Sequence, residues 1–253
     1  MTRRPAKDYL VFALDVPSAA AAEPLVERLA GAVGMFKIGL ELFVREGPAV
    51  AALVRRRGGA RIFLDLKLHD IPATVRRAMA AAAALEVDFV TVHCGESPAM
   101  LQAAVEGAGD RVKVFGVTVL TSVGPADLRA AGLRPEVAED PGNLVLARAA
   151  MAADAGCDGV VCAGHELMML KQRFGDRLLT VVPGIRPAAG EVAGDDQQRV
   201  MTPAAAVAAG ADYLVVGRPI RDAADPLEAA EAIVAQIAGA LQTRQDFKGT
   251  PGC

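Results

Sequence analysis

The feature that most constrains the fold of this chain is a repeat in which short apolar segments alternate with longer segments of helical spacing. Eight apolar segments are predicted to be strands: 10–15, 35–39, 61–67, 88–93, 112–119, 158–163, 178–185 and 212–217. Strands that alternate with helices form parallel sheets. Eight such units predict an α/β fold, a closed (β/α)8 barrel that forms one domain at about 250 residues.

An open, doubly wound sheet is the alternative arrangement of these elements. Such a sheet would normally stop near about five to seven strands, and no G-x-G-x-x-G follows the first predicted strand. Helical patterns such as 72–85 and 226–241 connect the strands without a Gly/Ser-rich linker. We therefore predict one barrel domain over residues 1–241. Residues 242–253 lack a helical period and are expected to form a flexible tail.

The charge and apolar pattern limit the location and partners of the chain. Its 253 residues carry a formal net charge of −3 and no run of five or more basic residues, which argues against a nucleic-acid or anionic-membrane partner. The first apolar run is short and ends at Asp15, and no run approaches the ~20 residues of a membrane span. We expect a cytoplasmic protein with no signal peptide.

Neither the cysteines nor the histidines form a metal-binding pattern. Cys94, Cys157, Cys162 and Cys253 include no C-x-x-C pair, and the three histidines are scattered along the sequence. Structural zinc sites need four such ligands at characteristic spacings. We therefore expect reduced cysteines and no metal.

Charged residues gather at the ends of two predicted strands. Asp65 and Lys67 are two residues apart on one strand, so their side chains are expected on the same face, and Lys37 lies on the strand before. Asp70 follows, just before Ile71-Pro72, where it is either part of this cluster or a residue that favours a helix start. Alternating charges would hold one another ionised. A charged Lys67 suits proton donation and anion stabilisation better than nucleophilic attack.

A second candidate site follows the eighth predicted strand, in VVGRP (215–219). Backbone N–H groups near Gly217 and the Arg218 guanidinium would suit a phosphate, which barrels often bind after strands seven and eight. Glycine is common at strand ends, so its position in the chain is what favours this interpretation. Two long connections, 120–142 and 186–201, follow predicted strands five and seven. The second is either a mobile lid or an ordinary solvated loop.

Taken together, these segments resemble the orotidine 5′-phosphate decarboxylase family. The run DLKLHDIPAT (65–74) matches the pattern D-x-K-x-x-D-I-P-x-T. The similarity continues in order through FALDV (12–16), FKIG (36–39), VTVLTS (117–122), PGIRP (183–187), DDQQRVMTP (195–203) and VVGRP (215–219). The resemblance implies decarboxylation of orotidine 5′-phosphate to uridine 5′-phosphate and CO2, the last step of de novo pyrimidine nucleotide synthesis. It also implies that no metal or organic cofactor takes part.

The resemblance further implies roles for individual residues. Lys67 matches the proton donor to C6, and Asp65 matches the carboxylate beside that of the substrate. Asp15, Lys37 and Asp70 match groups that bind the ribose and complete the charged network. The other matched positions are Ile71, Thr74, Thr121 near the pyrimidine, and Arg186, Gln197, Gly217 and Arg218 toward the phosphate.

Two of these assignments keep an alternative: Ser122 could replace Thr121, and Gln198 could replace Gln197. In this family Asp70, Ile71 and Thr74 reach into the neighbouring subunit's site. A homodimer with sites at its interface is therefore expected.

Two other functions share part of this sequence pattern. Sister enzymes acting on 3-keto-gulonate 6-phosphate or hexulose phosphates share D-x-K-x-x-D but use magnesium. They lack the I-P-x-T continuation and the PGIRP–DDQ segment found in this chain. An inactive barrel that binds a nucleotide is also possible, because a fold does not guarantee a function, although the intact charged set argues against it.

Overall fold

A closed barrel of eight parallel strands forms the centre of the protein. The computed structural model describes residues 4–187 and 201–249. The strands follow one another around the barrel in chain order, and β1 pairs with both β2 and β8. They are β1 (Leu10–Ala13), β2 (Met35–Gly39), β3 (Arg61–Leu68), β4 (Phe89–His93), β5 (Lys113–Val117), β6 (Gly159–Val161), β7 (Leu179–Val182) and β8 (Tyr213–Val216). Each overlaps its predicted segment, so the predicted single-domain barrel is confirmed.

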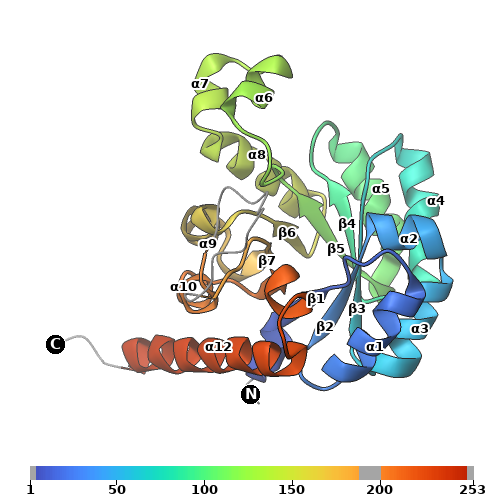
Figure 1. The fold of residues 1–253 in the computed structure, drawn as a ribbon. Coiled ribbons are helices and arrows are strands. Elements are labelled where there is room, and N and C mark those ends of the chain that lie inside the picture. Colours follow the sequence, from blue (N-terminus) through green and yellow to red (C-terminus); the bar gives the residue numbers. More distant parts are fainter. Residues whose placement is uncertain (1–3, 188–200, 250–253) are drawn as a thin grey trace.

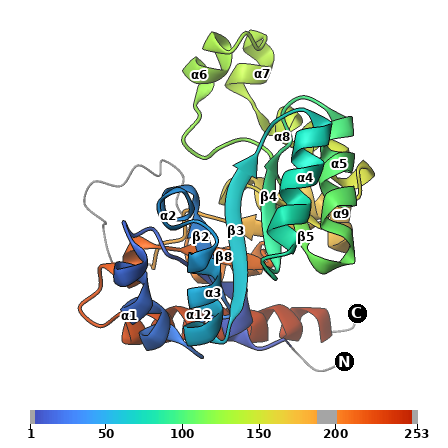
Figure 2. The same cartoon turned by 90° about the vertical axis from the view of Figure 1, so that its right-hand side faces the viewer.

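Helices surround the barrel, and the chain begins below it (Figure 1). They are α1 (Ala19–Leu29), α2 (Leu40–Glu46), α3 (Ala49–Gly58), α4 (Pro72–Ala83), α5 (Pro98–Ala108), α6 (Pro125–Ala130), α7 (Pro135–Glu139), α8 (Gly142–Asp154), α9 (Leu167–Phe174), α10 (Pro203–Ala208), α11 (Arg218–Arg221) and α12 (Pro226–Gly249). The long connection after β5 holds α6 and α7, which stand away from the barrel in both views (Figures 1 and 2). None of the helices within the described ranges has the length and apolar character of a membrane span.

The last helix continues past the predicted domain boundary. α12 runs to Gly249, so residues 242–249 are helical and the expected irregular tail does not begin at residue 242. Residues 242–248 include Gln, Arg and Lys, which have good intrinsic helix propensity and extend the helix after its apolar pattern stops. Residues 250–253 lie outside the described part of the chain.

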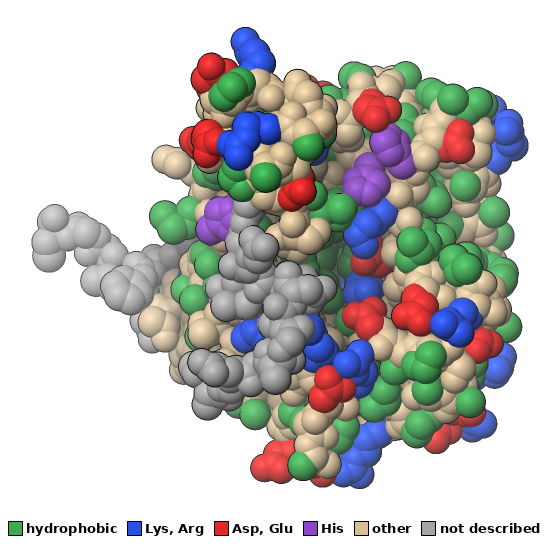
Figure 3. All heavy atoms as spheres, turned by 45° about the horizontal axis from the view of Figure 1, so that its top comes forward, with side chains coloured by type: hydrophobic (Ala, Val, Ile, Leu, Met, Phe, Trp, Pro, Cys, Tyr) green, Lys and Arg blue, Asp and Glu red, His purple; other side chains and the backbone are tan. Residues whose placement is uncertain are grey.

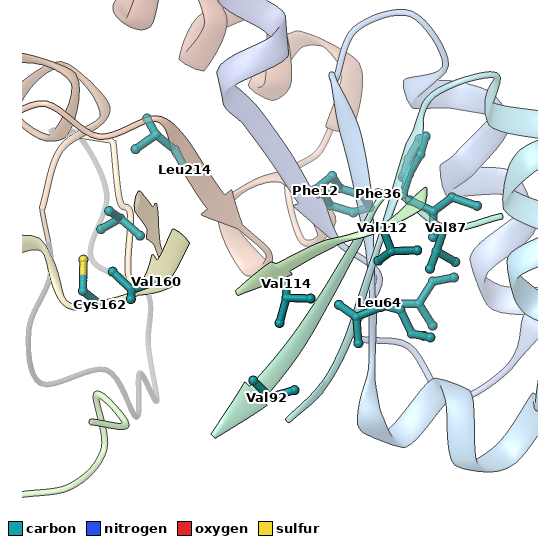
Figure 4. Close-up of a cluster of buried hydrophobic side chains, with 14 of the residues drawn as sticks. Phe12, Phe36, Leu64, Val87, Val92, Val112, Val114, Val160, Cys162 and Leu214 are labelled. Atoms are coloured by element: carbon teal, nitrogen blue, oxygen red, sulfur yellow. The ribbon is translucent and has the colours of Figure 1, made fainter. Parts of the chain in front are cut away.

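An apolar layer fills the space between the sheet and the helices. Figure 4 shows members of this layer, among them Phe12, Phe36 and Leu64, which are essentially inaccessible to solvent. The helices that cover it pack closely: a Cβ at Gly107 of α5 would lie 2.3 Å from the carbonyl oxygen of Arg76 on α4. Only glycine allows the two backbones to approach so closely.

Aromatic rings fill the interior of the barrel. The ring centroids of Phe89 lie 5.8 Å from Phe63, 4.5 Å from Phe115 and 4.9 Å from Tyr213. Side chains two positions apart on a strand share a face, so the next inward position after Phe63 is Asp65. The rings therefore form a buried apolar layer beneath the polar residues of the barrel mouth.

Three aspartates connect neighbouring strands at the opposite end of the barrel. Each stands directly before an even-numbered strand, and its carboxylate accepts a hydrogen bond from a backbone N–H of the strand before. The bonds are Asp88 with Ile62 at 2.8 Å, Asp158 with Val114 at 2.9 Å and Asp212 with Thr180 at 2.8 Å. These carboxylates satisfy N–H groups near the starts of β3, β5 and β7.

We predict that Asp88→Ala lowers the free energy of unfolding by about 1–3 kcal/mol, because the Ile62 N–H loses a charged acceptor. In a protein of this size that corresponds to roughly 2–4 °C in Tm per kcal/mol. Thermal unfolding monitored by circular dichroism measures the change. Asp110→Ala, an exposed aspartate at the same end of the barrel, is the matched control and should leave Tm unchanged. Equal Tm values for the two variants would contradict the proposed strand connection.

Candidate active site

A cavity of about 660 Å³ opens at the carboxyl ends of the strands. Basic and acidic side chains alternate along a hollow in this face of the molecule (Figure 3). Barrel enzymes place their active sites at this end. The predicted site residues that line the cavity are Asp15, Lys37, Asp65, Lys67, Thr121, Arg186, Gly217 and Arg218.

Asp65 is the centre of a charged cluster on the cavity wall. Its side chain lies 2.9 Å from the ammonium of Lys67 and 3.6 Å from that of Lys37. Asp65 and Lys37 are each less than 10% exposed, whereas the Lys67 side chain is 34% exposed. A buried carboxylate needs such partners because desolvation is costly. The two lysines therefore share one buried anion, with Lys67 the more accessible of them.

A bulge in β3 sets the position of Lys67. Leu64 pairs with Val90 and Leu68 with Val92, so β3 holds two more residues than β4 between these pairs. Within the bulge Lys67 has a φ of 52°, a left-handed conformation that is strained for a residue with a side chain. Lys67 and Asp65 thus reach the same cavity through a bulge rather than through regular strand alternation.

Thr91 of β4 holds the bulge in place. Its hydroxyl accepts a hydrogen bond from the Lys67 backbone N–H at 2.9 Å and donates one to Asp65 at 2.8 Å. Thr91 is fully buried. One hydroxyl therefore orients both the backbone of Lys67 and the carboxylate of Asp65.

Opposing effects set the ionisation of Asp65. Burial raises the pKa of this carboxyl, but the charges of Lys37 and Lys67 and the hydrogen bonds from Lys67 and Thr91 lower it by more. The net pKa lies below the ordinary value, so Asp65 is ionised at neutral pH.

Asp15 extends the cluster toward β1 and β8. Its carboxylate, which is 54% exposed, lies 3.1 Å from the ammonium of Lys37. A Cβ at Gly39 would lie 3.1 Å from Asp15 Oδ1 and 3.2 Å from Lys37 Nζ. Glycine at the end of β2 therefore leaves room for this ion pair.

Arginines also line the cavity. Arg186, which follows β7, and Arg218, which begins α11, line it beside Gly217. Such an arrangement suits an anion, because guanidinium groups bind phosphate oxygens in pairs. Gln197 and Gln198 lie outside the described residues, as does most of the predicted lid segment. Of the two candidate hydroxyl residues, Thr121 lines the cavity, whereas Ser122 is exposed and does not line it.

Asp70, Ile71 and Thr74 do not line the cavity of their own chain. Asp70 and Ile71 are exposed, and the Asp70 carboxylate accepts a hydrogen bond from the Ile71 N–H at 2.6 Å. Asp70 forms no ion pair with the described residues, so it does not join Lys37, Asp65 and Lys67 within a single chain. After the bulge the chain turns outward into α4, and Asp15 is the fourth charged residue of the cluster because it pairs with Lys37.

Two other side-chain groups near the cavity bear on its chemistry. The rings of His69 and His93 pack at a tilt with their centroids 5.6 Å apart, so these histidines are neighbours despite their separation in sequence. Within the described ranges, however, no three histidine, cysteine or acidic side chains are grouped to hold a metal. Burial raises the pKa of Cys162 on the cavity wall, which keeps it a thiol rather than a nucleophilic thiolate.

Sequence reasoning missed two polar residues of the site. Thr91 occupies the inward position after Phe89 in FVTVH, and this alternation was its only signal. Arg221 lines the cavity three residues after Arg218, a spacing that places two residues on the same side of a helical turn.

Known proteins resemble this chain over nearly its whole length. Residues 8–233 match the family described as orotidine 5′-phosphate decarboxylase / HUMPS. The orotidine 5′-phosphate decarboxylase of Desulfosudis oleivorans is 54% identical over 240 residues, covering 94% of this chain and 96% of the relative. That of an Anaeromyxobacter species (strain K) is 51% identical over 91% of this chain and 98% of its own length. The crystal structure of the Lactobacillus acidophilus orotidine 5′-phosphate decarboxylase superposes with a TM-score of 0.79 at 36% identity, covering 93% and 99% of the two chains.

We predict that Asp65→Asn destabilises the protein at neutral pH by about 1–3 kcal/mol, because two lysines lose their shared anion. The folded pKa of Asp65 lies below the unfolded value of about 3.9. The stability from its ionisation is therefore present above pH ~3.9 and is lost as the pH falls through the folded pKa.

Urea unfolding from pH 7 to pH 3 measures this dependence. The difference between the wild type and Asp65→Asn should shrink at the acid end. Asp110→Asn, which changes an exposed carboxylate at the opposite end of the barrel, is the control and should stay within about 0.5 kcal/mol of the wild type. A constant difference across the pH range would count against an ionised Asp65 as the source of the stability.

Proposed function

The chain belongs to the orotidine 5′-phosphate decarboxylase / HUMPS family, and from this premise we propose that it converts orotidine 5′-phosphate to uridine 5′-phosphate and CO2. It is then a carboxy-lyase of the last step of pyrimidine nucleotide synthesis, acting in the cytoplasm without a metal or organic cofactor. The observation that carries this proposal is the buried Asp65 carboxylate, which holds two lysines beside a nucleotide-sized cavity.

Lys67 is assigned the role of acid. Loss of CO2 breaks the bond between C6 and its carboxylate and leaves the electron pair on C6. A proton from the Lys67 ammonium then forms the new C6–H bond, and the neutral amine regains a proton from solvent. Because the C6 anion has little resonance stabilisation, a fixed cation next to it lowers the barrier and also supplies the proton. The strained backbone of Lys67 supports this role, because strain of this kind collects at functional sites.

Asp65 is assigned the place beside the carboxylate of the substrate. Its lowered pKa keeps it an anion, which keeps Lys67 and Lys37 directed at the reacting centre. Thr91 fixes the orientation of Asp65 by a hydrogen bond from its hydroxyl.

The other lining residues are assigned to substrate binding. Asp15 and Lys37 face the ribose, and Thr121 faces the pyrimidine. Arg186, Gly217 and Arg218 bind the phosphate, joined by Gln197 from the segment outside the described residues. Because the phosphate is remote from C6, its binding energy can hold the substrate in the reactive position.

A homodimer completes the site in this proposal. Asp70, Ile71 and Thr74 do not line the cavity of their own chain, and Ile71 is 66% exposed. Leu40 and Val44 on α2, in the preceding βα unit, are also exposed apolar residues. Exposed apolar groups of this kind mark interfaces, and a two-fold dimer would bring the Asp70 segment of each chain to the cavity of the other.

The sister enzymes of this family are the second candidate, because the matching family description is not restricted to orotidine 5′-phosphate decarboxylases. Their expected dependence on magnesium separates the two functions. The chain's relatives of about 50% identity are named as orotidine 5′-phosphate decarboxylases, which favours the first.

Incubation of the enzyme with orotidine 5′-phosphate and excess EDTA tests the function. The wild type should release CO2 at an undiminished rate, and Lys67→Ala should lose a factor of at least about 10²–10⁴. Absorbance of the pyrimidine measures the rate, and circular dichroism confirms that the variant is folded. No CO2 release by the wild type would overturn the proposed function, and equal rates for the wild type and Lys67→Ala would exclude Lys67 as the acid.

A mixing experiment tests the shared site. Lys67→Ala and Asp70→Asn should each be inactive alone, yet their mixture should recover about a quarter of wild-type activity. Random exchange makes half of the dimers mixed, and each mixed dimer has one intact site. Mixing Lys67→Ala with Asp65→Asn is the matched control and should recover nothing, since both residues serve the same site from the same chain. No recovery in the first mixture, with subunit exchange verified by labelled chains, would contradict a shared site.

A further inference from the structure

Arg221 is a charged residue of the cavity wall to which the proposed function assigns no role. It ends the one-turn helix α11, three residues after Arg218, and its side chain is 28% exposed. The matched family motif in this region stops at Pro219. Its position beside both Gly217 and Asp15 makes it a candidate for shaping the cavity.

The guanidinium of Arg221 is held on two sides. Its Nε and Nη2 donate to the two carboxylate oxygens of Asp222 at 2.6 and 2.9 Å, and its Nη1 donates to the carbonyl oxygen of Asp15 at 2.7 Å. A bidentate pair fixes the plane of the guanidinium. Asp222 therefore aims the remaining edge of Arg221 at the backbone of Asp15.

The hydrogen bond from Arg221 to Asp15 joins segments that lie beyond the end of the β1–β8 ladder. The β1–β8 ladder extends to the pairing of Phe12 with Val216, and Asp15 lies three residues beyond it. From there the carboxylate of Asp15 reaches Lys37, which belongs to β2 on the other side of β1. Arg221 thus anchors the backbone of Asp15 to the β8 side while Lys37 holds its carboxylate on the β2 side.

We propose that Arg221 is a positioning residue that fixes the Asp15 carboxylate at the ribose end of the cavity through its backbone carbonyl. This inference rests on the proposed function, because it takes Asp15 as a ligand of the ribose. Half of the Asp15 side chain is exposed, so neighbouring side chains restrain it only in part. A fixed backbone carbonyl therefore limits the positions that this carboxylate can take.

Two ligands separate this role from direct binding of the phosphate. Uridine 5′-phosphate and uridine share the ribose, but only the first carries a phosphate. If Arg221 acts through Asp15, Arg221→Gln should weaken inhibition by both compounds by the same factor, roughly 3–10-fold, which is the effect of one hydrogen bond. Arg218→Ala should instead weaken inhibition by uridine 5′-phosphate alone.

A double-mutant cycle with Asp15→Ala supplies the second readout. Arg221→Gln should raise the KM for orotidine 5′-phosphate in the wild type but not in the Asp15→Ala background, because no carboxylate is left to position. Arg177→Gln changes an exposed arginine outside the cavity and is the matched control. It should change neither the KM for orotidine 5′-phosphate nor the inhibition by the two uridine compounds. Circular dichroism and Tm verify that each variant is folded.

The outcomes separate the two proposals. If the wild type does not decarboxylate orotidine 5′-phosphate, the proposed function fails. The positioning role of Arg221 is overturned, and the proposed function stands, if the wild type is active but Arg221→Gln weakens inhibition by uridine 5′-phosphate alone or by neither compound. The same holds if the effects of Arg221→Gln and Asp15→Ala on the KM are fully additive.

Discussion

The ion pair between Asp65 and Lys67 is the interaction on which the rest of the site depends. A buried carboxylate without cations would be protonated or would destabilise the fold, and two neighbouring lysines without an anion would repel each other. At 2.9 and 3.6 Å the Asp65 carboxylate pairs with both ammonium groups, while about a third of the Lys67 side chain stays accessible. The same contact therefore stabilises the barrel mouth and leaves a directed ammonium for chemistry.

The fold supplies this interaction through its interior layers. Aromatic rings below the mouth exclude water, and the polar layer begins at the next inward position on β2, β3 and β4. The bulge in β3, held by Thr91, turns Lys67 into the cavity at the cost of a strained backbone. Strain at this position is consistent with the trade of stability for activity that active sites often show.

The sequence predicts the architecture well because strand and helix periods differ and repeat eight times. It also indicates which residues gather at the mouth, since residues at the carboxyl ends of barrel strands meet in space. Local chain direction is harder to predict. The bulge at Lys67 depends on pairing with β4, which no local pattern encodes. Thr91 and Arg221 were missed because their roles come from contacts with residues far away in the sequence, Asp65 for Thr91 and Asp15 for Arg221.

In the proposed reaction Lys67, directed by Asp65, exchanges a proton with C6 of the pyrimidine. An acid that protonates C6 must also remove that proton in the reverse direction, so the product itself reports on the step. The direct measurement is exchange of the C6 hydrogen of uridine 5′-phosphate for deuterium in D2O, followed by proton NMR. We expect exchange with the wild type and none above background with Lys67→Ala. Equal exchange by the two proteins would contradict it.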